Sequence, residues 1–248
     1  MAPPWEPSFN FYLSELEGGP VSFVLDMNAQ TLPSHPVRLQ VRVGLLSPRD
    51  DGLRDSSELD VMGHIEDQIV DRLAAALDAL FVGRFITAGA TVFVFYAPSA
   101  AKVDQCVGLI GPLATGYEAQ WRSEEDPTWR FFHEFLYPDR YSFQSMMNRS
   151  LLTQLEEAGD MLTASRVVDH FMLLPSMVEA EQASAALVAK GFRVDPLKVM
   201  ASGQYGLEAH RHDSLADQRP DHFVREILDI VLPLNGSYDG WGCVTVRN

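Results

Sequence analysis

Residues 166–174 read Arg-Val-Val-Asp-His-Phe-Met-Leu-Leu, and this stretch decides the fold of the C-terminal part of the chain. β-Branched and aromatic residues are frequent in it, which predicts a β-strand. Pro175 and Gly191 then bracket a predicted helix, because proline is favoured in the first helical turn and glycine just past the last. The elements predicted after this helix are strands over Phe192–Val199 and Tyr205–Asp213, a helix over Asp217–Leu232 and a strand over Tyr238–Val246.

The N-terminal half predicts a similar order of elements behind an added hairpin. Two apolar segments, Phe9–Leu13 and Val21–Leu25, flank Gly18-Gly19-Pro20, which is typical of a β-hairpin. Val37–Leu46 alternates apolar and polar residues, the pattern of a half-buried strand. A helix that Ser56 or Ser57 can cap is expected to run to about Leu80. The remaining predicted elements are strands over Phe81–Thr87 and Thr91–Tyr96, a helix over Ser99–Ile110 and a strand over Gly116–Trp121.

Each half therefore has the order β-α-β-β-α-β, which with right-handed crossovers gives a ferredoxin-like sandwich. Two helices cover one face of a four-stranded sheet in this fold. We predict an α+β protein of two tandem ferredoxin-like sandwiches, the first with an extra N-terminal hairpin. A length of 248 residues suits two domains. The expected division is residues 1–138 for the first domain, 139–160 for a helical connector and 161–248 for the second domain.

Charge argues against nucleic acid as a direct ligand. The net charge is −15, and both halves are acidic, so neither can neutralise phosphates well. An acidic surface can instead attract a basic protein partner, although the same charge also serves solubility. The two cysteines form no metal or disulfide signature, and neither a signal peptide nor a membrane span is recognisable. We expect a soluble, cytoplasmic protein of unknown oligomeric state.

Catalytic motifs are missing from the sequence. It contains no GxGxxG, GxxxxGK[ST], GxSxG or HExxH pattern, so the usual nucleotide, esterase and zinc-protease devices are absent. Asp50-Asp51-Gly52 lacks the alternating ligands of a calcium loop and is interpreted as a turn. We therefore predict no catalytic residues, no cofactor and no enzyme activity.

One polar cluster is expected on the open face of the second sheet. Leu207 and Ala209 should face the helices, which leaves Glu208, His210 and His212 on the opposite face because side chains alternate along a strand. Arg166 and His170 could join them from the neighbouring strand. Such a cluster could ligate Zn²⁺ or bind an anion, or it could serve as a protein interface, which is our preferred interpretation.

Aromatic residues provide two further candidates. Tyr238-Asp239-Gly240-Trp241 forms a turn or bulge, and its tyrosine and tryptophan could anchor a protein partner or could simply cap the sheet. In the first half, Arg84 with Phe85, Phe93 and Phe95 resembles an RNA-stacking platform, but no basic rim accompanies it. The residues predicted to bind a partner are Arg166, His170, His210, His212, Tyr238, Asp239 and Trp241.

From about Leu155 to Val246 the sequence resembles the RraB family, protein inhibitors of ribonuclease E. The matching features are Gly159-Asp160, Arg166 with His170, Gly191-Phe192 and Tyr238-Asp239-Gly240-Trp241. The resemblance implies an acidic regulator that acts on the non-catalytic, RNA-binding part of the ribonuclease. The expected partner is therefore a protein, such as the basic segment of a ribonuclease.

The first half resembles an uncharacterised domain family that often precedes an RraB-like domain, and this resemblance implies no role. The residues that carry it are Trp5, Tyr12, Asp51-Gly52, Glu58, Val82-Gly83-Arg84, Trp129 and Phe135-Leu136-Tyr137-Pro138. Two alternatives to a ribonuclease inhibitor stay open. One is a metal- or ligand-binding enzyme that uses the histidine cluster, and the other is a toxin-neutralising, immunity-like protein.

Overall fold

The chain folds into two compact units, residues 1–142 and 143–248, here called the N-terminal and C-terminal units. The structure is a computed structural model, and it describes residues 3–100, 110 and 116–247. The expected helix over Ser99–Ile110 falls almost wholly outside the described residues. None of the helices formed by described residues combines the length and the apolar character needed to cross a bilayer.

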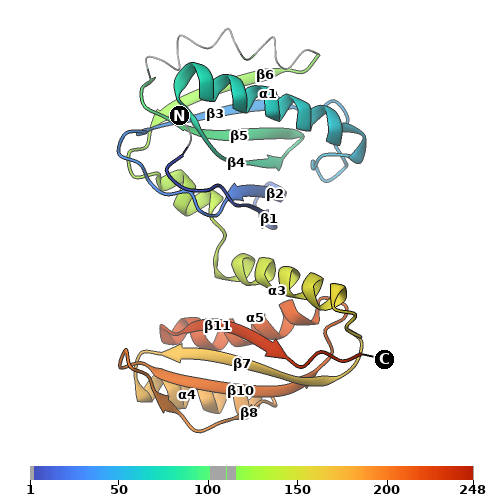
Figure 1. The fold of residues 1–248 in the computed structure, drawn as a ribbon, viewed down its shortest axis with the longest axis vertical. Helices are drawn as coiled ribbons and strands as arrows, with labels where there is room; N and C mark the ends of the chain where they lie inside the picture. Colours follow the sequence, from blue (N-terminus) through green and yellow to red (C-terminus); the bar gives the residue numbers. More distant parts are fainter. Residues whose placement is uncertain (1–2, 101–109, 111–115, 248) are drawn as a thin grey trace. The chain divides into compact units, whose positions relative to one another are not determined.

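The N-terminal unit contains a six-stranded antiparallel sheet (Figure 1). The strands lie in the order β1-β2-β4-β5-β3-β6. Their bounds are β1 Phe9–Leu16, β2 Gly19–Asp26, β3 Val37–Gly44, β4 Leu80–Thr87, β5 Ala90–Ala97 and β6 Ala119–Glu125. Apart from the hairpin β1–β2, the order β4-β5-β3-β6 is that of a ferredoxin-like sheet, with the first and third strands side by side in the middle.

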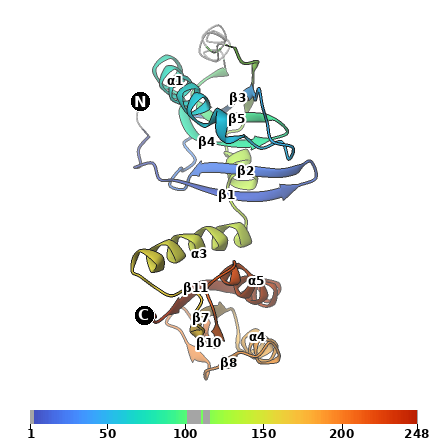
Figure 2. The same ribbon diagram turned by 90° about the vertical axis from the view of Figure 1, so that its right-hand side faces the viewer.

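Helix α1 (Leu59–Leu77), which follows the short 3₁₀ turn η1 (Ser56–Glu58), covers one face of this sheet (Figure 2). Its apolar side recurs at three- and four-residue steps, as an amphipathic helix requires. Ile65, Ile69 and Leu73 pack against Val41 and Phe93 of the sheet, and these residues form one buried cluster. This apolar cluster is the core of the N-terminal unit.

The opposite face of the same sheet is not bare, which corrects the open face that a sandwich with helices on one side only implies for this unit. The segment that follows β6 and contains the π-helix η4 (Phe132–Leu136) packs on it. Trp129 stacks on Tyr96 at 4.0 Å between ring centroids, and Phe135 meets Phe23 at 5.5 Å. Because these rings remove apolar surface from water, the segment belongs to the core and cannot act as a free connector.

The C-terminal unit is a second ferredoxin-like sandwich, with strand order β11-β7-β10-β8 and β9 paired to β10. Helix α3 (Arg140–Glu157) begins in the N-terminal unit and continues into this one. The elements that follow are β7 Arg166–Leu174, α4 Met177–Ala189, β8 Arg193–Val194, β9 Lys198–Val199, β10 Tyr205–Asp213, α5 Arg219–Val231, η5 Leu232–Leu234 and β11 Ser237–Cys243. The α+β class predicted from the sequence is confirmed, and the two antiparallel sheets with their helices are consistent with two tandem ferredoxin-like sandwiches.

Helices α4 and α5 cover one face of this second sheet (Figure 2). Phe223, Ile227 and Leu187 from the helices are buried with Val168 and Leu207 from the strands. The Ser176 hydroxyl caps the start of α4 by accepting a hydrogen bond from the Val178 N–H at 3.2 Å. The other face of this sheet carries no helix among the described residues of the C-terminal unit.

Candidate protein-binding surface

Strand β7 places the side chains of Arg166 and His170 on its buried side. The prediction that these two residues lie on the open face of the sheet is therefore wrong. Arg166 is 6% exposed and His170 2%, on the same side of β7 as the fully buried Val168 and Met172. The register with β10 places His170 opposite Ala209, whose side chain also faces the helices. Because side chains alternate along a strand, His210 points to the other face of the sheet.

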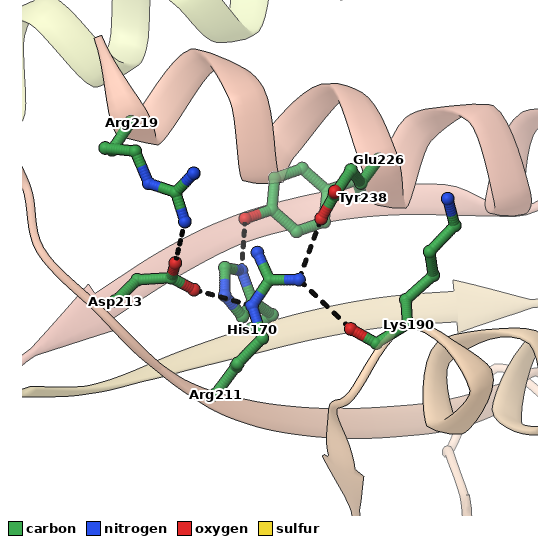
Figure 3. A network of polar contacts seen from close by, with 7 residues as sticks. All are labelled: His170, Lys190, Arg211, Asp213, Arg219, Glu226 and Tyr238. Atoms are coloured by element: carbon green, nitrogen blue, oxygen red, sulfur yellow. Dashed lines mark hydrogen bonds and ion pairs between the residues drawn. The ribbon is translucent and has the colours of Figure 1, made fainter. Parts of the chain in front are cut away.

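His170 is a buried, neutral core residue. Its ring lies edge-on to Phe192 and Phe223, and its Nδ1 is 2.9 Å from the Tyr238 hydroxyl (Figure 3). Its Nε2 has no hydrogen-bond partner among the residues that the structure describes. Burial lowers the pKa of His170 to about 3 because a charged ring would lose its hydration there. His170 therefore neither binds a solvent-borne partner nor serves as a metal ligand with His210.

An ion-pair network lies beside His170, at the end of β10 (Figure 3). Asp213, 4% exposed, accepts hydrogen bonds from Arg211 at 2.7 Å and Arg219 at 2.5 Å. Arg211 also pairs with Glu226 of α5 at 2.8 Å and lies over the Phe192 ring. Two cations satisfy the buried carboxylate, so the network ties β10 to α5 and has a structural role.

Arg166 and Asp160, which both belong to the matching features found in the sequence, form a buried ion pair. Arg166 donates to Asp160 at 2.5 Å, and Val246 N–H donates to the same carboxylate oxygen at 2.8 Å. The side chains of the pair are 5% and 0% exposed. Burial raises the pKa of Asp160, but the hydrogen bonds from Arg166 and Val246 outweigh this effect and lower it. The pair thus latches the C-terminal segment onto the sandwich.

The aromatic turn divides between the core and the surface. Tyr238, on β11, is buried at 7% exposure beside His170, and a β-bulge lies between Tyr238 and Gly240. Trp241 is half-buried, and its indole N–H donates to Asn148 of α3 at 2.7 Å. Asp239 is exposed. The turn therefore offers Asp239 to solvent, while Tyr238 and Trp241 have partners within the unit.

The open face of the sheet presents a polar surface around His210. Its Nδ1 lies 2.5 Å from Asp169, and its Nε2 lies 3.1 Å from Asp195. Glu208, next on the same face, accepts a hydrogen bond from Lys198 at 2.8 Å. His212 on this strand is exposed. Sequence reasoning missed Asp195, because that residue reaches the face from the loop after β8.

We call the open-face surface the β7–β10–β11 face; it comprises Asp169, Phe171, Glu208, His210, His212 and Asp239. A shallow hollow of about 520 Å³ lies on it, where Gly240 and Gly242 of β11 lack side chains. Of the seven residues predicted to bind a partner, His210, His212 and Asp239 lie on this face. Their binding to a partner remains a prediction.

A metal ion could be held only at one place on this face, as far as the described residues reach. One ligand atom each of Asp195, Glu208 and His210 lies within 4.8 Å of the others. Arg193 already pairs with Asp195 at 3.1 Å, and Lys198 pairs with Glu208. A cation would have to displace both basic side chains. The arrangement therefore fits an ion-paired polar surface better than a metal centre.

The conspicuous residues of the N-terminal unit have structural roles as well. Arg84 pairs with Glu66 of α1 at 2.7 Å, while Phe93 and Phe95 are fully buried. The alternative of an RNA-stacking platform at these residues is therefore wrong. Glu58 accepts hydrogen bonds from the backbone N–H groups of Leu46 and Ser47, at 2.9 and 3.1 Å, and so fixes the loop before α1.

Two family models match the chain. The model described as a family of unknown function (DUF695) matches residues 8–137, and the model for Regulator of ribonuclease activity B (RraB) matches residues 145–243. No curated protein matches. Among solved structures, a candidate glycine cleavage system transcriptional repressor is 8% identical, covering 84% of this chain and 98% of its own, with a TM-score of 0.24. An unknown protein from Galdieria sulphuraria is 9% identical, covering 85% and 99%, also with a TM-score of 0.24.

Proposed function

We propose, from the premise that the chain belongs to the DUF695 family and carries an RraB domain, that it is a non-enzymatic, cytoplasmic regulator of RNA decay. Its C-terminal unit binds and inhibits a ribonuclease E-type enzyme by protein–protein contact. The match of residues 145–243 to the RraB family is the observation that carries this proposal. The absence of recognisable catalytic motifs in the sequence agrees with it.

The β7–β10–β11 face is the part of the C-terminal unit that suits such a partner. It contains the exposed carboxylates of Asp169 and Asp239 beside the two histidines and the half-buried Phe171. Polar and charged groups around an apolar element are the usual composition of a transient interface. The net charge of −15 supports a basic segment as the region of the ribonuclease that docks.

A matched pair of charge reversals tests this placement. Asp239→Lys changes the proposed face, and Glu181→Lys makes the same change at an exposed position on α4, which covers the other face. Binding of each full-length variant to a purified ribonuclease E-type enzyme is measured by interferometry at physiological salt. We expect Asp239→Lys to weaken binding about tenfold, because a like charge then meets the basic partner.

Glu181→Lys should leave the affinity within about twofold of the wild type. Equal losses for the two variants would place the interface elsewhere while leaving the regulator proposal intact. No binding by the wild-type chain to any ribonuclease of this class would contradict the proposal itself.

A further inference from the structure

The N-terminal unit contains a hollow of about 490 Å³ on the sheet face opposite α1. It lies next to the part of that face covered by the segment around η4, and Phe85 borders both. The cross-strand register aligns Phe85 with Val92 and Val92 with Arg42, so these side chains form one row across the hollow. The volume is within the range of small-molecule sites, roughly 300–1,000 Å³.

Charge in this hollow is opposite to that of the protein as a whole. Arg42 and Arg122 line it, and no acidic residue is among its lining residues. Neither guanidinium forms an ion pair with any residue that the structure describes, whereas Arg38 on the same strand pairs with Glu124. Two guanidinium groups without a carboxylate partner, in a chain of net charge −15, favour a bound anion over a cation.

Gln40 supplies a further hydrogen-bond donor beside these cations. Its side-chain oxygen accepts a hydrogen bond from Arg122 Nε at 2.5 Å, and since a guanidinium only donates, the orientation of the amide is fixed. Its Nε2 is therefore a donor, and it has no partner within the described part of the chain, although Gln40 is only 2% exposed. A buried donor without a partner is destabilising, and an oxyanion that reaches it removes this cost.

Taken together, the two guanidinium groups, the unpaired amide and the apolar floor match one class of ligand. We propose that this hollow binds a small organic anion, in which a carboxylate or phosphate group is attached to an apolar body. Arg42, Arg122 and Gln40 hold the oxyanion, and Phe85 and Val92 contact the apolar body. This site is separate from the proposed ribonuclease interface and does not depend on it.

The Gln40 side-chain amide provides a direct reporter of binding. Uniformly ¹⁵N-labelled full-length protein is titrated with phenyl phosphate and with benzoate as anionic probes, and with benzyl alcohol as the neutral control. The Gln40 signal is assigned by its loss in Gln40→Met. Probes of this size are expected to bind with dissociation constants on the order of 1 mM, which chemical-shift titration can measure.

Arg42→Gln and Arg122→Gln should each weaken the anion about tenfold, because each removes a charged hydrogen bond. Arg72→Gln, at an exposed position on α1, removes the same charge away from the hollow and should change nothing. Saturable shifts of the Gln40 amide with an anion but not with benzyl alcohol support the proposal, and the tighter of the two anions identifies the preferred group. Absence of saturation with both anions, equal binding of benzyl alcohol, or wild-type affinity in both hollow variants would overturn it.

Discussion

Replacement of Asp160 by asparagine tests whether the Gly159-Asp160 and Arg166 motif is a structural latch. The asparagine side chain would keep the shape of the aspartate but remove the charge that faces Arg166 at 2.5 Å. The side chains of Arg166 and Asp160 are almost fully buried, at 5% and 0% exposure, so the guanidinium would keep its charge with a much weaker partner. Breaking a buried ion pair by changing one partner costs about 3–5 kcal/mol.

We expect Asp160→Asn to lower the free energy of unfolding by about 3 kcal/mol in urea titrations of the full chain. This value is at the lower end of the range because the amide oxygen of asparagine can still accept the hydrogen bond from the Val246 N–H. Asp195→Asn, at the more exposed pair with Arg193, should cost less than about 1 kcal/mol and is the matched control. The double variant Asp160→Asn with Arg166→Met should recover part of the loss. A cost below about 1 kcal/mol for Asp160→Asn would refute the latch.

Three other changes test the fold and its core. Burial lowers the pKa of His170 from 6.5 to about 3, so between these two pH values the unfolded state binds a proton that the folded state does not. The contribution of neutral His170 to the free energy of unfolding is therefore present above pH 6.5 and is lost as the pH falls. We expect a loss of about 2 kcal/mol between pH 7.5 and pH 5. Hydrogen exchange of β7 amides measures this loss, and an NMR titration of His170 near pH 6.5 would contradict it. Gly83→Ala should cost more than about 2 kcal/mol in urea unfolding, since its Cβ would lie 2.4 Å from the Val24 carbonyl oxygen at a φ of +148°. Gly63→Ala, with open space in α1, should instead stabilise by about 0.5–1 kcal/mol. The same sign for both glycines would contradict the close approach of Gly83 to Val24 at the β-bulge between Phe81 and Gly83.

The order of elements could be predicted from periodicity, but the inward face of β7 could not. Alternation places Arg166, Val168, His170 and Met172 on one side of the strand, and it does not say which side meets the helices. The register decides this, because His170 is paired with Ala209. Apolar residues lie on both sides of the strand, with Val168 and Met172 on one and Val167 and Phe171 on the other, so the sequence of β7 alone gave no signal for the inward side.

Contacts between distant segments were beyond sequence reasoning. Asp195 meets His210 from a loop whose path no local pattern specifies. The segment around Trp129 was placed within the first domain, but its packing on the sheet was not predicted, because a short aromatic-rich stretch carries no period long enough to show which surface it covers. The domain boundaries at 138 and 161 remain a prediction. Limited proteolysis would test them: first cuts between these positions would support a connector there, whereas protection of α3 would assign that helix to the C-terminal unit, as the contact of Asn148 with Trp241 indicates.

The measurement that most directly tests the account is the cleavage rate of a ribonuclease E-type enzyme on a fluorogenic RNA, with and without the full-length chain. The chain should slow cleavage in a saturable manner that approaches one equivalent per binding site, and Asp239→Lys should shift that curve to higher concentration. An unchanged cleavage rate at a tenfold excess of chain, under salt conditions where the enzyme is active, would contradict the proposed regulation.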